Sequence, residues 1–301
     1  MHAPETLLEI LEGLDGAATV EEVVPGFPVI KIKTPQATAE IALHGAQVLG
    51  WQPEGAEPVL FTSLKAVFEE GTAIRGGIPI CWPWFGAHPD DASMPSHGFA
   101  RTRFWELTSA GMEGQDAVLV FKLPVTDETR AMFPHEFELT ATIQVGMQLG
   151  VALKTRNLGE KSFRIGGALH TYFRVGDITR TQVDGVKGAT FVDMLAGPDE
   201  QEMTEQLKID GEIDVIYQSM SSLLLRDLSM HRAIFVDKFG SRSTVVWNPW
   251  KEKSKELKDL PNNAYKEFVC VEVANAGKDR PTVRPNMSHT LRATIGMRPL
   301  A

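Results

Sequence analysis

Two side chains in this 301-residue sequence are suited to moving protons, and both lie in apolar stretches. His170 follows the small and apolar residues 166–169, and Glu272 lies within the apolar run 268–273. A carboxylate among apolar residues carries a desolvation cost, so Glu272 either faces solvent or is held in a functional pocket. A histidine at a strand end can face a cavity, although a structural histidine is the simpler interpretation. Asp214 is a weaker candidate, because an acidic residue in a turn explains it.

A second group of candidates lies in residues 73–86 and 97–101, a stretch rich in glycine, proline and aromatic residues. Arg75 and Arg101 bracket it, and guanidinium groups suit carboxylate or phosphate oxygens. Its glycines and prolines disfavour a regular central strand or a long helix and predict a shaped loop. The alternative is that one or both arginines form structural ion pairs in this acidic chain. Its aromatic side chains could stack on a sugar, but core packing explains most of them equally well.

The composition excludes several classes of function. A formal net charge of −9 argues against a nucleic acid or an anionic membrane as partner, although a small anionic ligand remains compatible with it. Cys81 and Cys270 lie far apart in apolar surroundings and are expected to be buried, reduced thiols. The eight histidines show no recognised metal-ligand spacing, so no metal is expected. An acidic N-terminus and the lack of an apolar run of about 20 residues predict a cytoplasmic protein.

The rest of the sequence consists mainly of short predicted strands separated by turns. Residues 137–145 alternate most clearly between apolar and polar, and 149–153 repeat the alternation after a turn, which predicts a hairpin. Helices are expected over 4–13, within an N-terminal helical extension 1–22, and over 251–260. Further strands are expected at 28–33, 39–43, 104–107, 117–123, 162–165, 180–183, 222–227, 233–236, 243–246, 268–273 and 289–295. Because no linker or repeat divides the chain, residues 1–301 are predicted to form one all-β domain of two large antiparallel sheets packed face to face.

Taken together, these motifs resemble those of the hexose-6-phosphate mutarotases, or glucose-6-phosphate 1-epimerases, a branch of the aldose 1-epimerases. The resemblance covers most of the chain, from about residue 30 to about 295, with the motifs in the family's order. It rests on residues 74–79, Pro83 with Phe85-Gly86, residues 97–101, residues 169–173, Asp214 with Tyr217, residues 246–250 and residues 270–272.

The resemblance implies a β-supersandwich fold of the galactose-mutarotase type, with the site in a groove on one sheet. It implies that His170 and Glu272 are the catalytic pair. The substrate contacts that it implies are Arg75, His97, Arg101 and Asp214. One position departs from the family, since Trp84 stands where a glutamine is common. An indole offers one N–H donor and a stacking face, so Trp84 is expected to contact the substrate and to influence which sugar is accepted.

The reaction that the resemblance implies needs no cofactor, since nothing is oxidised when two anomers interconvert. Glu272 is expected to act as general base at the C1 hydroxyl and His170 as general acid at the ring oxygen of a hexose phosphate. The protein is expected to be a monomer. Two other functions remain open from the sequence: an epimerase acting on neutral aldoses, and a non-catalytic carbohydrate-binding or metabolite-sensing protein. A structural interaction domain has little support.

Overall fold

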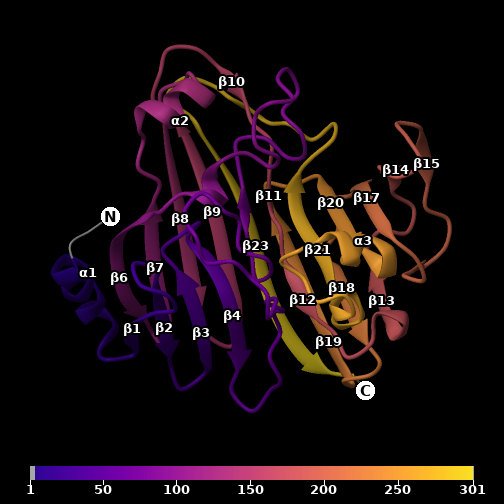
Figure 1. Ribbon diagram of the computed structural model, residues 1–301, viewed down its shortest axis with the longest axis horizontal. Coiled ribbons are helices and arrows are strands. Elements are labelled where there is room, and N and C mark those ends of the chain that lie inside the picture. The colour runs from indigo at the N-terminus through magenta and orange to yellow at the C-terminus, as the bar shows by residue number, and fades with distance from the viewer. Residues whose placement is uncertain (1–3, 301) are drawn as a thin grey trace.

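A nine-stranded antiparallel sheet is the largest element of the fold (Figure 1). The structure is a computed structural model and describes residues 4–300. The strand order in this sheet is β16-β13-β18-β19-β23-β9-β8-β7-β6. The strands are β6 (Glu106–Glu113), β7 (Asp116–Lys122), β8 (Phe137–Val145), β9 (Leu149–Asn157), β13 (Thr181–Asp184), β16 (Leu207–Lys208), β18 (Leu223–Asp227), β19 (Arg232–Phe239) and β23 (Ser288–Pro299).

An eight-stranded sheet carries the functional candidates, in the order β15-β14-β17-β20-β21-β11-β5, with β12 also paired to β21. Its strands are β5 (Ile80–Cys81), β11 (Gly167–Leu169), β12 (Tyr172–Arg174), β14 (Thr190–Asp193), β15 (Glu200–Glu202), β17 (Ile213–Gln218), β20 (Ser243–Asn248) and β21 (Phe268–Asn275). A four-stranded sheet contains β1 (Ala18–Glu22), β2 (Pro28–Lys33), β3 (Ala37–Ala42) and β4 (Gln47–Pro53), and a two-stranded sheet pairs β10 (Phe163–Arg164) with β22 (Thr282–Val283).

The core lies between these sheets because their strands alternate in facing. In β8 every second residue is buried from Phe137 to Val145, as the sequence predicted, and the strand pairs with β9 in the expected hairpin. Strand β21 is buried along its whole length. Val269, Val271 and Val273 pack in the main core, whereas Phe268, Cys270 and Ala274 belong to smaller clusters on its other face. That second face of β21 is the face that carries Glu272.

The helices are short and lie outside the sheets. They are α1 (Pro4–Leu11), α2 (Asp127–Met132) and α3 (Trp250–Glu256), with 3₁₀ turns η1 (Glu12–Leu14), η2 (Ala100–Thr102), η3 (Ile178–Arg180) and η4 (Ala264–Glu267). Figure 1 shows α1 beside β6, the edge strand of the large sheet. Within the described part of the chain, no helix combines the length and the apolar character that crossing a membrane requires.

The N-terminal segment differs from the prediction. Helical structure continues only to Leu14, and residues 18–22, expected to lie in a helical extension, form strand β1 instead. Val20 pairs with Ile30 of β2 and packs against the core, so pairing to an existing sheet outweighs the local helical signal. Residues 1–3 lie outside the described residues. The charged helix predicted over 251–260 begins at Trp250 and ends earlier, at Glu256.

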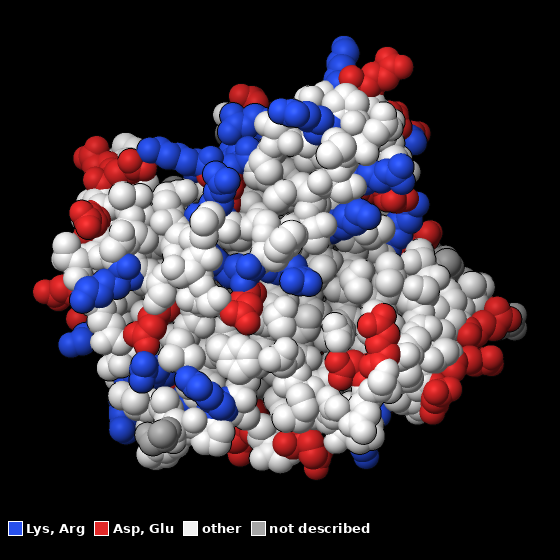
Figure 2. All heavy atoms as spheres, turned by 180° about the vertical axis from the view of Figure 1, so that it is seen from behind, with Lys and Arg blue, Asp and Glu red and all other residues white. Residues whose placement is uncertain are grey.

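Surface charge is mixed. Figure 2 shows that, on the face opposite to that of Figure 1, lysine and arginine side chains lie among aspartates and glutamates and do not form one continuous basic surface. This distribution accompanies the formal net charge of −9.

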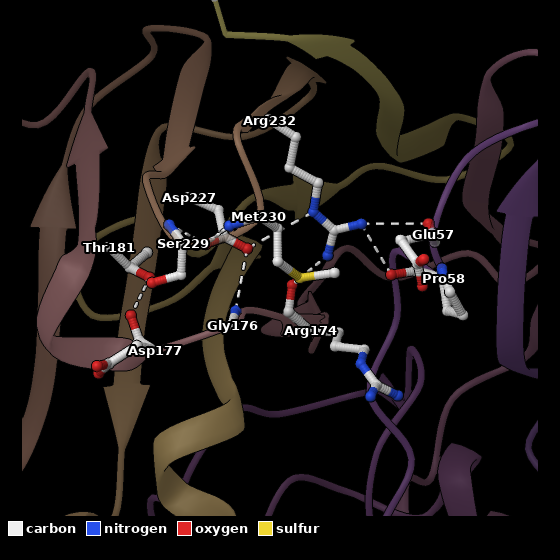
Figure 3. A network of polar contacts seen from close by, with 10 residues as sticks. All are labelled: Glu57, Pro58, Arg174, Gly176, Asp177, Thr181, Asp227, Ser229, Met230 and Arg232. Atoms are coloured by element: carbon white, nitrogen blue, oxygen red, sulfur yellow. Dashed lines mark hydrogen bonds and ion pairs between the residues drawn. The ribbon is translucent and has the colours of Figure 1, made fainter.

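A buried ion pair joins the two ends of the β18–β19 turn (Figure 3). The Asp227 carboxylate is fully buried and accepts hydrogen bonds from the backbone N–H groups of Gly176, Ser229 and Met230. The guanidinium of Arg232 lies 3.6 Å from it and donates to the carbonyl oxygens of residues 57, 58 and 174. Removing one partner of such a pair leaves an uncompensated buried charge.

We therefore expect Asp227→Ala to lower the free energy of unfolding by about 3–5 kcal/mol in guanidinium denaturation. The matched control is Asp184→Ala in β13. It breaks the exposed ion pair with Arg226, which lies on the same strand as Asp227, and should lower the free energy of unfolding by less than about 1 kcal/mol. Equal losses in the two variants would show that the Asp227 network contributes no more than a surface pair.

Candidate functional site

A groove of about 1080 Å³ lies over the eight-stranded sheet and the loops that flank it. All seven residues that the sequence singled out line this groove: Arg75, Trp84, His97, Arg101, His170, Asp214 and Glu272. They come from five separate parts of the chain, and the fold brings all of them together.

Strand pairing places His170 beside Glu272. On one edge of β21, Leu169 of β11 pairs with Val273 and Tyr172 of β12 pairs with Cys270. Residues 170 and 171 lie between β11 and β12, and the register of these strands against β21 continues through them. His170 therefore lies opposite Glu272, and side chains that are opposite each other on adjacent strands are in contact. The observed distance from His170 Nδ1 to Glu272 Oε1 is 3.3 Å.

The pair is buried without hydrogen-bond partners. Glu272 is 1% exposed and His170 is 7% exposed. Among the described residues, neither Glu272 carboxyl oxygen nor His170 Nδ1 has a hydrogen-bond partner. Buried polar groups are normally satisfied, because leaving them unpaired costs stability. Unpaired acid and base groups at the floor of a groove are therefore positioned to bond a ligand.

Burial shifts the pKa values of the two groups in opposite directions. It raises the pKa of Glu272 well above its usual range, with a further contribution from Asp214. It lowers the pKa of His170 well below its usual range, assisted by His97 and the two guanidinium groups. Both shifts favour the uncharged forms. The pair therefore shares one titratable proton over a broad pH range, and burial places that proton on Glu272.

His97 also lines the groove, where its uncharged imidazole can donate a hydrogen bond. Its backbone has φ +67°, and its Nδ1 accepts a hydrogen bond from the Gly86 N–H at 3.3 Å. Burial and the neighbouring Arg101 and Arg75 lower the pKa of His97 to about 3. The ring therefore carries its proton on Nε2, which can donate to a ligand. Its centroid lies 5.8 Å from that of His170.

Close backbone approach shapes the loop that carries these cations. A Cβ on Gly77, which has φ +61°, would lie 2.1 Å from the Val48 carbonyl oxygen. A Cβ on Gly98, which has φ +73°, would lie 2.0 Å from the Trp82 carbonyl oxygen. Glycine is required at both positions for space and for conformation.

The two arginines differ in how far the protein already uses them. Arg75 donates from Nε to Asp259 at 3.0 Å and from one Nη to the Tyr172 hydroxyl at 3.1 Å, so the structural ion pair that the sequence left open as an alternative does occur there. Arg101 forms no ion pair among residues 4–300. One of its Nη atoms donates to the Ser96 carbonyl, and its buried Nε has no partner in that range. Arg101 is thus the guanidinium with more unused donors.

Trp84 and Asp214 both line the groove, but the indole N–H of Trp84 is already used, and Asp214 does not lie in the turn that the sequence suggested. Trp84 is 4% exposed, and its indole N–H already donates to the Pro95 carbonyl at 2.8 Å, so only its ring is left to face a ligand. Asp214 lies in strand β17 and not in a turn. Burial, with the charges of Asp193 and Glu212, raises its pKa.

Sequence reasoning assigned no role to Tyr172, Trp247 or Asp259, yet all three line the groove. Strand register could have found two of them, since Tyr172, Cys270, Trp247 and Asp214 form one row across four strands. Asp259 gives no such signal. Groups of three or more potential metal ligands do not occur in the described part of the chain.

Comparisons with known proteins show which family this chain resembles. The family model described as aldose 1-epimerase matches residues 28–296. A protein of Escherichia coli (strain K12) named "Putative glucose-6-phosphate 1-epimerase" is 36% identical over 263 residues, which cover 87% of each chain.

Solved structures extend the comparison. The crystal structure of "a putative mutarotase" from Salmonella typhimurium has a TM-score of 0.89 and 31% identity, and the match covers 99% of this chain and 100% of that one. A galactose mutarotase-like protein from Clostridium acetobutylicum has a TM-score of 0.71 at 14% identity, over 94% of this chain and 98% of the other. The second likeness shows the fold alone, a β-sandwich of the galactose mutarotase-like type, as expected from the sequence.

The electrostatics of the groove give a measurable outcome. We expect ¹⁵N NMR of the imidazole nitrogens to find His97 and His170 uncharged at pH 6.5, with His97 titrating near pH 3. Since a neighbouring cation opposes the imidazolium form, Arg101→Gln should raise the pKa of both rings. Arg226→Gln, which removes a cation from an exposed ion pair outside the groove, should leave them unchanged. A His170 ring that becomes charged above pH 6.5 in the unmodified protein would contradict this description.

Proposed function

The chain belongs to the aldose 1-epimerase family, and we propose that it is a glucose-6-phosphate 1-epimerase that interconverts the α and β anomers of a hexose 6-phosphate. The observation that carries the proposal is the buried contact of 3.3 Å between His170 and Glu272 in a groove that arginines also line. An acid and a base in contact suit a reaction at one carbon that bears two oxygens.

The mechanism requires two proton transfers at the anomeric centre. Glu272 as carboxylate removes the proton from the C1 hydroxyl, and His170 as imidazolium protonates the ring oxygen. The bond between C1 and the ring oxygen breaks, and the C1 oxygen forms the carbonyl of the open aldehyde. Rotation about C1–C2 presents the other face of the carbonyl, and the reverse transfers close the ring. Each positioned group typically contributes about 10²–10⁴-fold.

The proton count of the pair fits this scheme. Burial favours protonated Glu272 beside neutral His170, and moving that one proton to the imidazole gives the carboxylate and imidazolium that the reaction uses. No proton has to enter or leave the groove, because the base gains one proton when the acid loses one. When the ring closes, the reverse transfers return Glu272 to the carboxylate and His170 to the imidazolium from which ring opening began.

The other candidates have supporting roles. Arg101, with its unused donors, and Arg75 supply charge-assisted hydrogen bonds to the phosphate. His97 donates from Nε2, and Asp214, two strands from Glu272, accepts from ring hydroxyls. Holding the opened sugar near its reclosing geometry adds an orientation effect. Trp84 contributes its ring to the lining of the groove, and its indole N–H is already bonded to Pro95.

The acid–base assignment can be tested by substitution. We expect Glu272→Gln and His170→Asn each to lower kcat by about 10²–10⁴-fold, measured by NMR magnetisation transfer between the two anomers of glucose 6-phosphate. Glu138→Gln, on the partly exposed face of β8 and outside the groove, and His289→Gln, also outside the groove, serve as matched controls and should retain activity. Exchange that is undiminished in either site variant would reject that residue's role.

Phosphate recognition has its own test. Because Arg101 is the guanidinium with more unused donors, Arg101→Ala should raise KM for glucose 6-phosphate at least about tenfold more than KM for glucose. Arg75→Ala is less clean, since it also frees Asp259 and Tyr172. The double variant carries both Arg75→Ala and Arg101→Ala. If KM for glucose and KM for glucose 6-phosphate changed equally in Arg101→Ala and in this double variant, an epimerase of neutral aldoses would be favoured.

A further inference from the structure

Tyr172 lies between the arginine and the histidine of the groove and touches both. It is 2% exposed. Its hydroxyl oxygen accepts a hydrogen bond from an Nη of Arg75 at 3.1 Å. Its ring is stacked on the imidazole of His170, with ring centroids 4.9 Å apart and planes inclined by only 10°. One buried side chain thus contacts a cation at its polar end and the proposed acid on its face.

The surroundings of Tyr172 hold its ring in place. Phe268 and Trp247 pack against it at centroid distances of 5.3 and 6.1 Å. Its backbone N–H donates to the Gly77 carbonyl, and its carbonyl accepts from the Phe61 N–H, both at 2.9 Å. With its backbone paired and its ring enclosed by aromatic neighbours, the phenol has little freedom to turn.

The imidazole of His170 depends on that ring for its orientation. In many sites a hydrogen bond to one imidazole nitrogen fixes the plane of the ring. Here Nδ1 has no hydrogen-bond partner among the described residues, and the Glu272 oxygen lies 3.3 Å away without the alignment of a bond. His97 and Trp247 meet the imidazole in T-shaped contacts at centroid distances of 5.8 and 6.1 Å, whereas Tyr172 stacks nearly parallel to it at 4.9 Å. This closer stack is the contact that sets the plane of His170.

The guanidinium of Arg75 is oriented from two sides. Asp259 accepts from Nε and Tyr172 from one Nη. A guanidinium has five N–H donors, so the remaining three are held in a defined direction. Asp259 and Tyr172 together fix how Arg75 faces the groove.

From these contacts we infer that Tyr172 is a positioning residue that supports the anion-binding guanidinium of Arg75 and the imidazole of His170 at once. The inference rests on the proposed function and adds to it a physical link between phosphate binding and acid catalysis. The two contacts use different parts of one side chain: the hydroxyl supports Arg75, and the ring face supports His170.

Two substitutions separate the two contacts. Tyr172→Phe keeps the stack and removes the hydroxyl, so KM for glucose 6-phosphate should rise about tenfold, with kcat changed by less than about threefold. Tyr172→Leu removes the stack as well, so kcat should fall by at least about tenfold. Tyr265→Phe alters another buried tyrosine, which packs on Trp250 outside the groove, and should change neither constant.

A second readout does not depend on turnover. Arg75, Arg101, His97 and Glu272 are the charged or titratable groups that face His170 besides Tyr172. Leucine fills less space than tyrosine and admits water beside the imidazole, so Tyr172→Leu should raise the pKa of His170 toward 6.5 in ¹⁵N NMR, whereas Tyr172→Phe should not.

The outcomes distinguish this inference from the proposed function. If the unmodified protein exchanges no sugar anomers, the proposed function fails, and the His170 titration in the two variants still decides the positioning role. Wild-type kinetics and titration in both folded variants would overturn the inference. So would an equal loss of kcat in Tyr172→Phe and Tyr172→Leu, because the hydroxyl and not the stacked ring would then orient His170.

Discussion

Strand β21 is paired along both edges, and that pairing forces a carboxyl group and an imidazole into contact away from water. β20 holds one edge, and β11 and β12 hold the other, so Glu272 cannot move to solvent without breaking the sheet. On the opposite face of the same strand, valines at alternate positions fill the core. Unpaired buried polar groups are costly, and they persist where the surrounding structure fixes them. The contact between the proposed acid and base is thus held by backbone hydrogen bonds and core packing.

The side of the groove that carries Arg75 and Arg101 is positively charged, although the protein as a whole is acidic. The chain carries a formal net charge of −9, yet Arg75 and Arg101 both lie close enough to His97 and His170 to lower the pKa of these rings. Glycines in the loop let its backbone pack within contact distance of neighbouring strands, which keeps both guanidiniums beside the sheet. Fixed cations in a groove attract anions and hold the histidines neutral at the same time. The proposed anion binding and the proposed proton transfer thus share one electrostatic environment.

Periodicity in the sequence predicted the features that depend on local pattern. The β8–β9 hairpin and a cation-bearing loop followed from alternation and residue type. Other features depend on partners distant in the chain. The sequence assigned Asp214 to a turn, although pairing of β17 with β20 makes it part of a strand. The contact of Arg75 with Asp259 joins residues 184 positions apart, which no local pattern encodes. Strand β1 likewise forms only because β2 offers an edge to which it can pair.

We propose that His170 and Glu272 move protons at the anomeric carbon of a hexose phosphate. NMR magnetisation transfer between anomers tests this with the unmodified protein, for glucose, galactose and mannose, each with and without a 6-phosphate. We expect anomer exchange that increases in proportion to protein concentration and is faster for at least one 6-phosphate than for the same sugar without it. Exchange no faster than in buffer alone, for all six sugars, would contradict it.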